Sequence, residues 1–163
     1  MIKRRWIGAA LVLAACSGGS AGGAGEVDPA NSASSAVTAF LQAVSDSNLS
    51  KMAALWGTTA GPSARTRQPP DYERRVAVMQ AYLRHDDSRI VSDTPEAIPT
   101  RHTVQAELRR SACTWSVPFV VIQLSNGGWI VNSVDLVTAG NPSRPCRSQA
   151  GDTAGTEPDA GTS

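Results

Sequence analysis

The segment "TWSVPFVVIQLSNGGWIVNSVDLV", residues 114–137, constrains the fold of this chain more than any other segment. Two runs rich in β-branched and aromatic residues flank Asn126 and Gly127, and that dipeptide favours the positive φ angles of a type I′ turn. A two-residue loop fixes the register of the two strands, so Leu124 should face Trp129. We therefore predict an antiparallel hairpin.

Both faces of this hairpin are expected to be apolar. In the predicted register, one face carries Val117, Phe119, Val121, Ile130, Val134 and Leu136, and the other carries Val120, Ile122, Leu124, Trp129 and Val131. An antiparallel sheet with one solvated face alternates apolar and polar residues instead. We therefore expect a homodimer or a protein partner to cover the outer sheet face.

The hydrophobic period of the chain changes from 3.6 to 2 after Asp87. Before it, apolar stripes predict helices over residues 34–48, 49–56 and 69–87. After it, "RIVSD" and "RHTVQAELR" predict two further strands ahead of the hairpin. The expected fold class is α+β, with three N-terminal helices packed on a four-stranded antiparallel sheet.

This order of elements resembles the nuclear transport factor 2-like (cystatin-like) superfamily over about residues 31–137. The similarity lies in the opening "AVTAFLQAVSDSNLSKMAALW" and the closing "GGWIVNSVDLV". It implies a curved sheet that wraps around the helices and leaves a conical pocket. The superfamily includes dehydratases, isomerases and epoxide hydrolases as well as binding domains without chemistry, so fold alone does not give function. The catalytic residues of the ketosteroid isomerase type do not map, because both Tyr72 and Tyr82 fall on the third predicted helix.

The N-terminus has the composition of a secretory signal peptide. Lys3, Arg4 and Arg5 precede an uncharged run over residues 6–15. Ten helical residues span only about 15 Å, half of a hydrocarbon core of about 30 Å, so this run is no transmembrane anchor. It ends in "LAAC", which resembles the bacterial lipobox. The resemblance implies that residues 1–15 are removed and that Cys16 carries diacylglycerol and a free or acylated amino terminus.

Lipidation of Cys16 implies a protein of the cell envelope, anchored to a bacterial membrane. Two or more acyl chains hold a protein stably on a bilayer. Ser17 follows the cysteine, where aspartate would argue for the inner membrane, so we expect the outer membrane where the cell has two. Residues 16–30 would form a flexible tether with a reach of about 20 Å. The α+β domain is expected over residues 31–139, and residues 140–163 should form a mostly disordered tail.

Charge and cysteine content exclude several partners. The chain from Cys16 onward has 12 Lys and Arg against 14 Asp and Glu, and its Arg74-Arg75 and Arg109-Arg110 pairs are expected to be solvated. Without a basic cluster, nucleic acid is not an expected partner. Cys113 and Cys146 match no metal-site spacing, and a disulfide is the leading interpretation in an exported protein; it would pin the tail. No metal or other cofactor is expected.

Two residues are candidates for catalysis. His102 shares a strand face with Val104 and Leu108, so it should point into the cavity, where it could act as a general base with Asp135 or Glu107. Strand parity places Glu107 on the opposite face. The competing interpretation of His102 is a hydrogen-bonded histidine of the core or rim, and Asp135 could equally be a surface acid.

The sequence favours a membrane-anchored envelope lipoprotein that acts as a non-catalytic binding or interaction module. Its partner would be a protein or a small apolar ligand. One alternative is an enzyme of the dehydratase, isomerase or hydrolase type that uses the conical pocket with His102 as base. Another is a passive structural component of the envelope.

Overall fold

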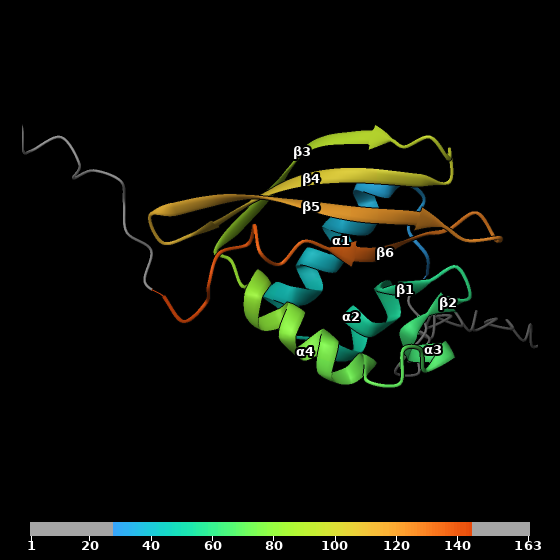
Figure 1. The fold of residues 1–163 in the computed structure, drawn as a ribbon, viewed down its shortest axis with the longest axis horizontal. Helices are drawn as coiled ribbons and strands as arrows, with labels where there is room; N and C mark the ends of the chain where they lie inside the picture. Colours follow the sequence, from blue (N-terminus) through green and yellow to red (C-terminus); the bar gives the residue numbers. More distant parts are fainter. Residues whose placement is uncertain (1–27, 145–163) are drawn as a thin grey trace, which may run out of the picture.

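A computed structural model describes residues 28–144, and within them the fold is α+β (Figure 1). The helices lie on one side of a four-stranded antiparallel sheet whose strands follow one another in chain order. The helices are α1 (Ala33–Ser45), α2 (Leu49–Leu55), α3 (Ser63–Thr66) and α4 (Tyr72–Leu83). The sheet contains β3 (Asp87–Pro95), β4 (Arg101–Arg110), β5 (Cys113–Gln123) and β6 (Trp129–Val134). The predicted fold class and four-stranded sheet are therefore confirmed.

The number of helices differs from the prediction of three. The structure has four between residues 28 and 144, because α3 lies in a stretch whose Gly, Pro and Thr content predicted a loop. A small two-stranded sheet, β1 (Gly57–Thr58) and β2 (Gly61–Pro62), precedes it. The hydroxyl of the buried Ser63 donates to the carbonyl oxygen of Gln68 at 2.6 Å. A four-residue helix held by such local hydrogen bonds has no hydrophobic period to detect.

The loop between β5 and β6 differs from the predicted two-residue turn. The backbone N–H of Gly127 donates to the carbonyl of Leu124, and the N–H of Leu124 donates to the carbonyl of Gly128. Gly127 has a φ of 85°, whereas Asn126 is not among the residues with positive φ. A type I′ turn needs positive φ at both central residues, so the loop is instead the three-residue kind in which only the glycine is left-handed.

The longer loop shifts the register of the hairpin beside the turn. Gln123, not Leu124, is the partner of Trp129. Farther along, Phe119 faces Val134 as predicted, because a bulge at Asn132 of β6 absorbs the difference of one residue.

This shift changes which side chains reach the core. A slip of one residue moves a side chain to the other face of the sheet. Trp129 and Val131 accordingly belong to the main core instead of the outer face. Ile130 joins Ile122 and Leu124 in a small separate cluster of buried residues, which we call the Ile122 cluster.

Much of the outer sheet face is polar. An ion pair joins Arg89 of β3 to Glu107 of β4 at 2.6 Å. A second joins Glu96, just after β3, to Arg101 of β4 at 2.8 Å. These ion pairs lie on β3 and β4, beside the hairpin whose outer face was predicted to be apolar.

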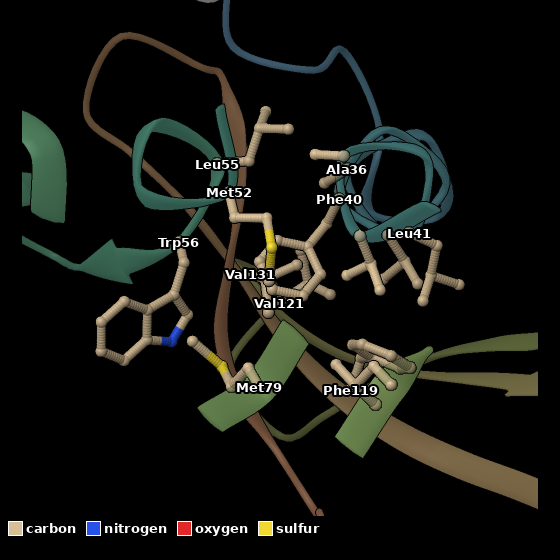
Figure 2. Close-up of a cluster of buried hydrophobic side chains, with 14 of the residues drawn as sticks. Ala36, Phe40, Leu41, Met52, Leu55, Trp56, Met79, Phe119, Val121 and Val131 are labelled. Atoms are coloured by element: carbon tan, nitrogen blue, oxygen red, sulfur yellow. The ribbon is translucent and has the colours of Figure 1, made fainter. Parts of the chain in front are cut away.

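The main core lies between the sheet and the helices (Figure 2). Phe40 of α1 packs edge-to-face on Phe119 of β5, with ring centroids 6.4 Å apart. Around this pair lie fully or nearly fully buried side chains from every layer: Leu41, Met52, Leu55, Met79, Val121 and Val131. No helix in the described part of the chain is both long and apolar enough to cross a membrane.

The predictions for the two ends of the chain fall largely outside the described residues. These include the signal peptide (1–15), Cys16, most of the tether, and the tail from residue 145 onward, with Cys146. Cys113, the first residue of β5, is disulfide-bonded. Its pairing with Cys146 remains a prediction.

Candidate functional site

A pocket of about 360 Å³ opens beside α4, and we call it the α4–β6 pocket. Its lining comes from the residue after α2, from α4 and the residue before it, and from β6 with a residue after it. The lining residues are Trp56, Asp71, Arg74, Arg75, Val78, Met79, Asn132, Ser133, Val134 and Leu136. The volume is at the lower end of the range of about 300–1,000 Å³ that is typical of small-molecule sites.

The deeper wall of this pocket is chemically apolar. Trp56 and Met79 are nearly buried and lie at one edge of the core cluster (Figure 2). The indole N–H of Trp56 donates to the carbonyl oxygen of Asn132 at 2.9 Å, and the Asn132 side-chain amide donates to the carbonyl oxygen of Gly57 at 2.9 Å. These polar groups are already paired, so this wall offers a ligand mainly apolar contact.

The rim of the pocket is charged. Asp71, at the start of α4, pairs with Arg75 one turn later, with Oδ1 and Nε 2.9 Å apart. The hydrogen bond from Arg75, aided by the charges of Arg75 and Arg74, holds the pKa of Asp71 below its ordinary value of 3.8. Arg74 is exposed and forms no ion pair with a described residue. The three charges together leave the rim with a single excess positive charge.

A second polar group, the His102 cluster, lies between the first turn of α1 and the sheet. His102 of β4 places Nδ1 2.6 Å from Oδ1 of Asp93, and its ring meets Trp129 edge-on with centroids 4.7 Å apart. The hydroxyl of Ser34 donates to the other oxygen of Asp93 at 2.7 Å. Ser34, Asp93, His102 and Trp129 thus join α1, β3, β4 and β6.

The carboxylate beside His102 is Asp93, which the sequence did not single out. Asp93 follows a register shift between Ile90 and Ser92 in the pairing of β3 with β4. Simple alternation from Ile90 would put Asp93 on the opposite face, but the shift returns it to the same face. A bulge of this kind has no reliable signal in the sequence.

The pKa of Asp93 reflects this environment. Partial burial acts to raise the pKa of the carboxyl. Hydrogen bonds from the Ser34 hydroxyl, the His102 ring and the Ser34 backbone, with the charge of His102, outweigh burial and lower the pKa below its ordinary value of 3.8. The structure therefore favours the ionised form of Asp93.

The two carboxylates suggested for His102 lie elsewhere. Glu107 forms its ion pair with Arg89 on the outer sheet face. Asp135 is exposed, and its Oδ1 accepts a hydrogen bond from the backbone N–H of Val137 at 3.0 Å. Neither Asp135 nor His102 lines the α4–β6 pocket.

No group of three or more His, Cys, Asp and Glu side chains that could hold a metal ion occurs within residues 28–144. Comparison with known proteins gives no match, whether with a family model, a curated protein or a solved structure.

Proposed function

We propose that this chain is an envelope lipoprotein, anchored through Cys16, whose α+β domain binds a small apolar ligand without catalysing a reaction on it. The α4–β6 pocket is the observation that carries the binding role. It combines a volume of about 360 Å³ with a wall built from Trp56 and Met79. Val78 at its rim is 42% exposed, although it is a large apolar residue on a helix.

The same proposal includes the cone of the nuclear transport factor 2-like superfamily. It is supported by helices that cover one face of a four-stranded antiparallel sheet (Figure 1). It is also supported by a pocket that opens between α4 and the last strand, β6.

The other roles considered from the sequence have less support. A dimer or protein partner on the outer sheet face would use the Ile122 cluster, but its side chains are already at most 9% exposed. A catalytic role for His102 lacks a connection to the α4–β6 pocket, which His102 does not line. A passive structural role would not account for the α4–β6 pocket.

Binding of 1-octanol, measured by titration calorimetry, tests the pocket. The full-length protein would be held in lipid nanodiscs, and the same titration into empty nanodiscs would be subtracted. Val78→Asp places a charge at the pocket rim and should weaken octanol binding at least about tenfold, because the carboxylate would be desolvated against an apolar ligand. Val91→Asp is the matched control, since Val91 is 51% exposed on β3 and does not line the pocket. Equal affinities of the two variants, or no binding to wild type, would contradict the proposal.

Metabolic labelling with palmitate tests the anchor separately. The wild-type chain should incorporate label and remain with the membrane fraction after a salt wash. Cys16→Ser should lose the label and appear in the soluble fraction. Equal incorporation into both proteins would show that Cys16 is not the site of acylation.

A further inference from the structure

The polar groups of the α4–β6 pocket leave one charged side chain, that of Arg74, available to a ligand. The indole of Trp56 and the amide of Asn132 are used within the protein, and Asp71 is paired with Arg75. Arg74 lines the same pocket, and its side chain forms no hydrogen bond with a described residue. Ser133 also lines the pocket, but it lies directly opposite Val120, so its side chain is on the outer sheet face, away from α4. A guanidinium is charged and only donates hydrogen bonds, so it favours an anionic acceptor.

We infer that the ligand is a small amphiphile with one negative charge, an alkyl carboxylate whose head binds Arg74 and whose tail covers Trp56 and Met79. This inference rests on the proposed binding function and specifies its ligand. The single excess positive charge at the rim matches one carboxylate and disfavours a cationic head. Arg74 can bind both oxygens of a carboxylate in a planar, bidentate arrangement.

The apolar wall of the pocket indicates that the ligand has an apolar part and is not a small inorganic anion. The paired indole and amide leave the deeper wall without free donors, so a fully polar ligand would lose hydration there without compensation. Val78 is exposed at the rim beside these groups and would be covered by an alkyl chain. A pocket of about 360 Å³ holds a short chain or part of a longer one.

Three ligands with the same eight-carbon tail separate the contribution of the head from that of the tail. Octanoate, 1-octanol and octylammonium would be titrated into the full-length protein in nanodiscs, with empty nanodiscs as the blank. We expect octanoate to bind at least about fivefold more tightly than octanol, as a partly exposed charge-assisted contact allows. Octylammonium should bind most weakly. Added salt should weaken the binding of octanoate and leave that of octanol unchanged.

Arg74→Gln removes the charge while keeping a good helix former on the surface of α4. It should reduce the affinity for octanoate to that for octanol, with octanol binding unchanged. Arg109→Gln is the control, because Arg109 pairs with Asp87 on the sheet, away from the pocket. It should retain the preference for octanoate.

The outcomes separate this inference from the proposed function. Equal binding of octanoate and octanol, tighter binding of octylammonium, or an unchanged preference in Arg74→Gln would overturn the carboxylate ligand and leave an apolar pocket standing. Failure of all three ligands to bind would overturn both.

Discussion

His102 connects more parts of the molecule than its position in the middle of a sheet suggests. Its ring contacts Trp129 of β6 and hydrogen-bonds to Asp93 of β3, and Asp93 in turn accepts from Ser34 near the start of α1. The side chain of His102 is only 20% exposed. Through these contacts His102 helps to hold α1 against the sheet. They agree with the interpretation of His102 as a hydrogen-bonded histidine of the core or rim, which the sequence left open.

Replacing His102 by alanine should therefore destabilise the fold. The change removes the aromatic contact with Trp129 and leaves Asp93 with one partner fewer, for an expected loss of about 1–2 kcal/mol in the free energy of unfolding. Urea unfolding followed by tryptophan fluorescence measures this loss. An unchanged midpoint would contradict a role for His102 in holding α1 against the sheet and would favour its alternative role as a general base.

Asp93 should give the fold a dependence on pH in the acid range. Its pKa is lower in the folded state than the ordinary value of 3.8, so the folded protein binds this proton less readily than the unfolded chain. The stabilisation is fully present above pH 3.8 and is lost as the pH falls below 3.8 through the lower folded-state pKa. Asp93→Asn should flatten this part of the stability profile, measured by urea unfolding at a series of pH values. A profile as steep as that of wild type would argue that Asp93 is not the group responsible.

At the scale of elements, α4 is tied to the sheet by Arg110 at the end of β4. The guanidinium donates to the carbonyl oxygens of Tyr82 at 2.7 Å and Arg84 at 2.8 Å, which lie at the C-terminal end of α4. It also lies over the ring of Trp115, 4.9 Å from the centroid. A cation at this end of a helix satisfies carbonyl groups that lack helical partners.

Arg110→Ala should cost about 1–3 kcal/mol in the free energy of unfolding, because it removes two charge-assisted hydrogen bonds and a cation–π contact. Arg110→Lys should recover only part of this loss, since an ammonium cannot reproduce the planar arrangement of donors. The neighbouring Arg109 is the matched control. Its ion pair with Asp87 is long, at 3.8 Å, and exposed, so Arg109→Ala should change stability by no more than about 0.5 kcal/mol. Similar losses of stability for both alanine variants would contradict the specific role of Arg110 in holding α4 against the sheet.

Periodicity predicts those elements that have a strong apolar face, and it fails where the backbone departs from regular repetition. The stripe of Val37, Phe40, Leu41 and Val44 is buried in α1 as expected, and His102 lies on the inner sheet face with Val104. The choice of loop at Gly127 and the bulges in β3 and β6 depend on the packing of the whole sheet. The loop decides that Trp129 points inward, and the bulge in β3 decides that Asp93 meets His102.

The candidate sites were harder to predict than the fold for the same reason. Asp93 joins His102 only because of the register shift in β3. Both arginine pairs were expected to be solvated. Arg74 is exposed as expected, although it also lines a pocket, whereas Arg110 is bound to the end of α4. Nothing in an adjacent pair of arginines shows which of the two will meet another element.

At the scale of the whole molecule, none of the three cysteines of the chain is expected to keep a free thiol. Acylation would occupy the thiol of Cys16, and a disulfide would join Cys113 to Cys146. Such a bridge would constrain the unfolded chain by about 3–4 kcal/mol in the loop-entropy account. The two modifications exclude any other pairing.

Peptide mapping of the native protein without reduction should recover one peptide that contains both Cys113 and Cys146. Cys146→Ser should expose a thiol at Cys113 that reacts with a thiol reagent, and it should lower the urea midpoint. Reduction of the wild-type protein provides the control for the loss of the bridge alone. A peptide that joins Cys113 to Cys16 would disprove this pairing and, with it, the lipid anchor.

The first described residues join the domain at one particular end of the sheet. The carbonyl of Ala30 accepts from the backbone N–H of Trp129 at 2.8 Å, beside the loop that joins β5 to β6. The turn between β3 and β4 lies at the same end, because the N–H of Gln123 donates to the carbonyl of Thr100. A tether from Cys16 would thus enter the domain at this corner. The end of the sheet where β5 begins would lie opposite this attachment.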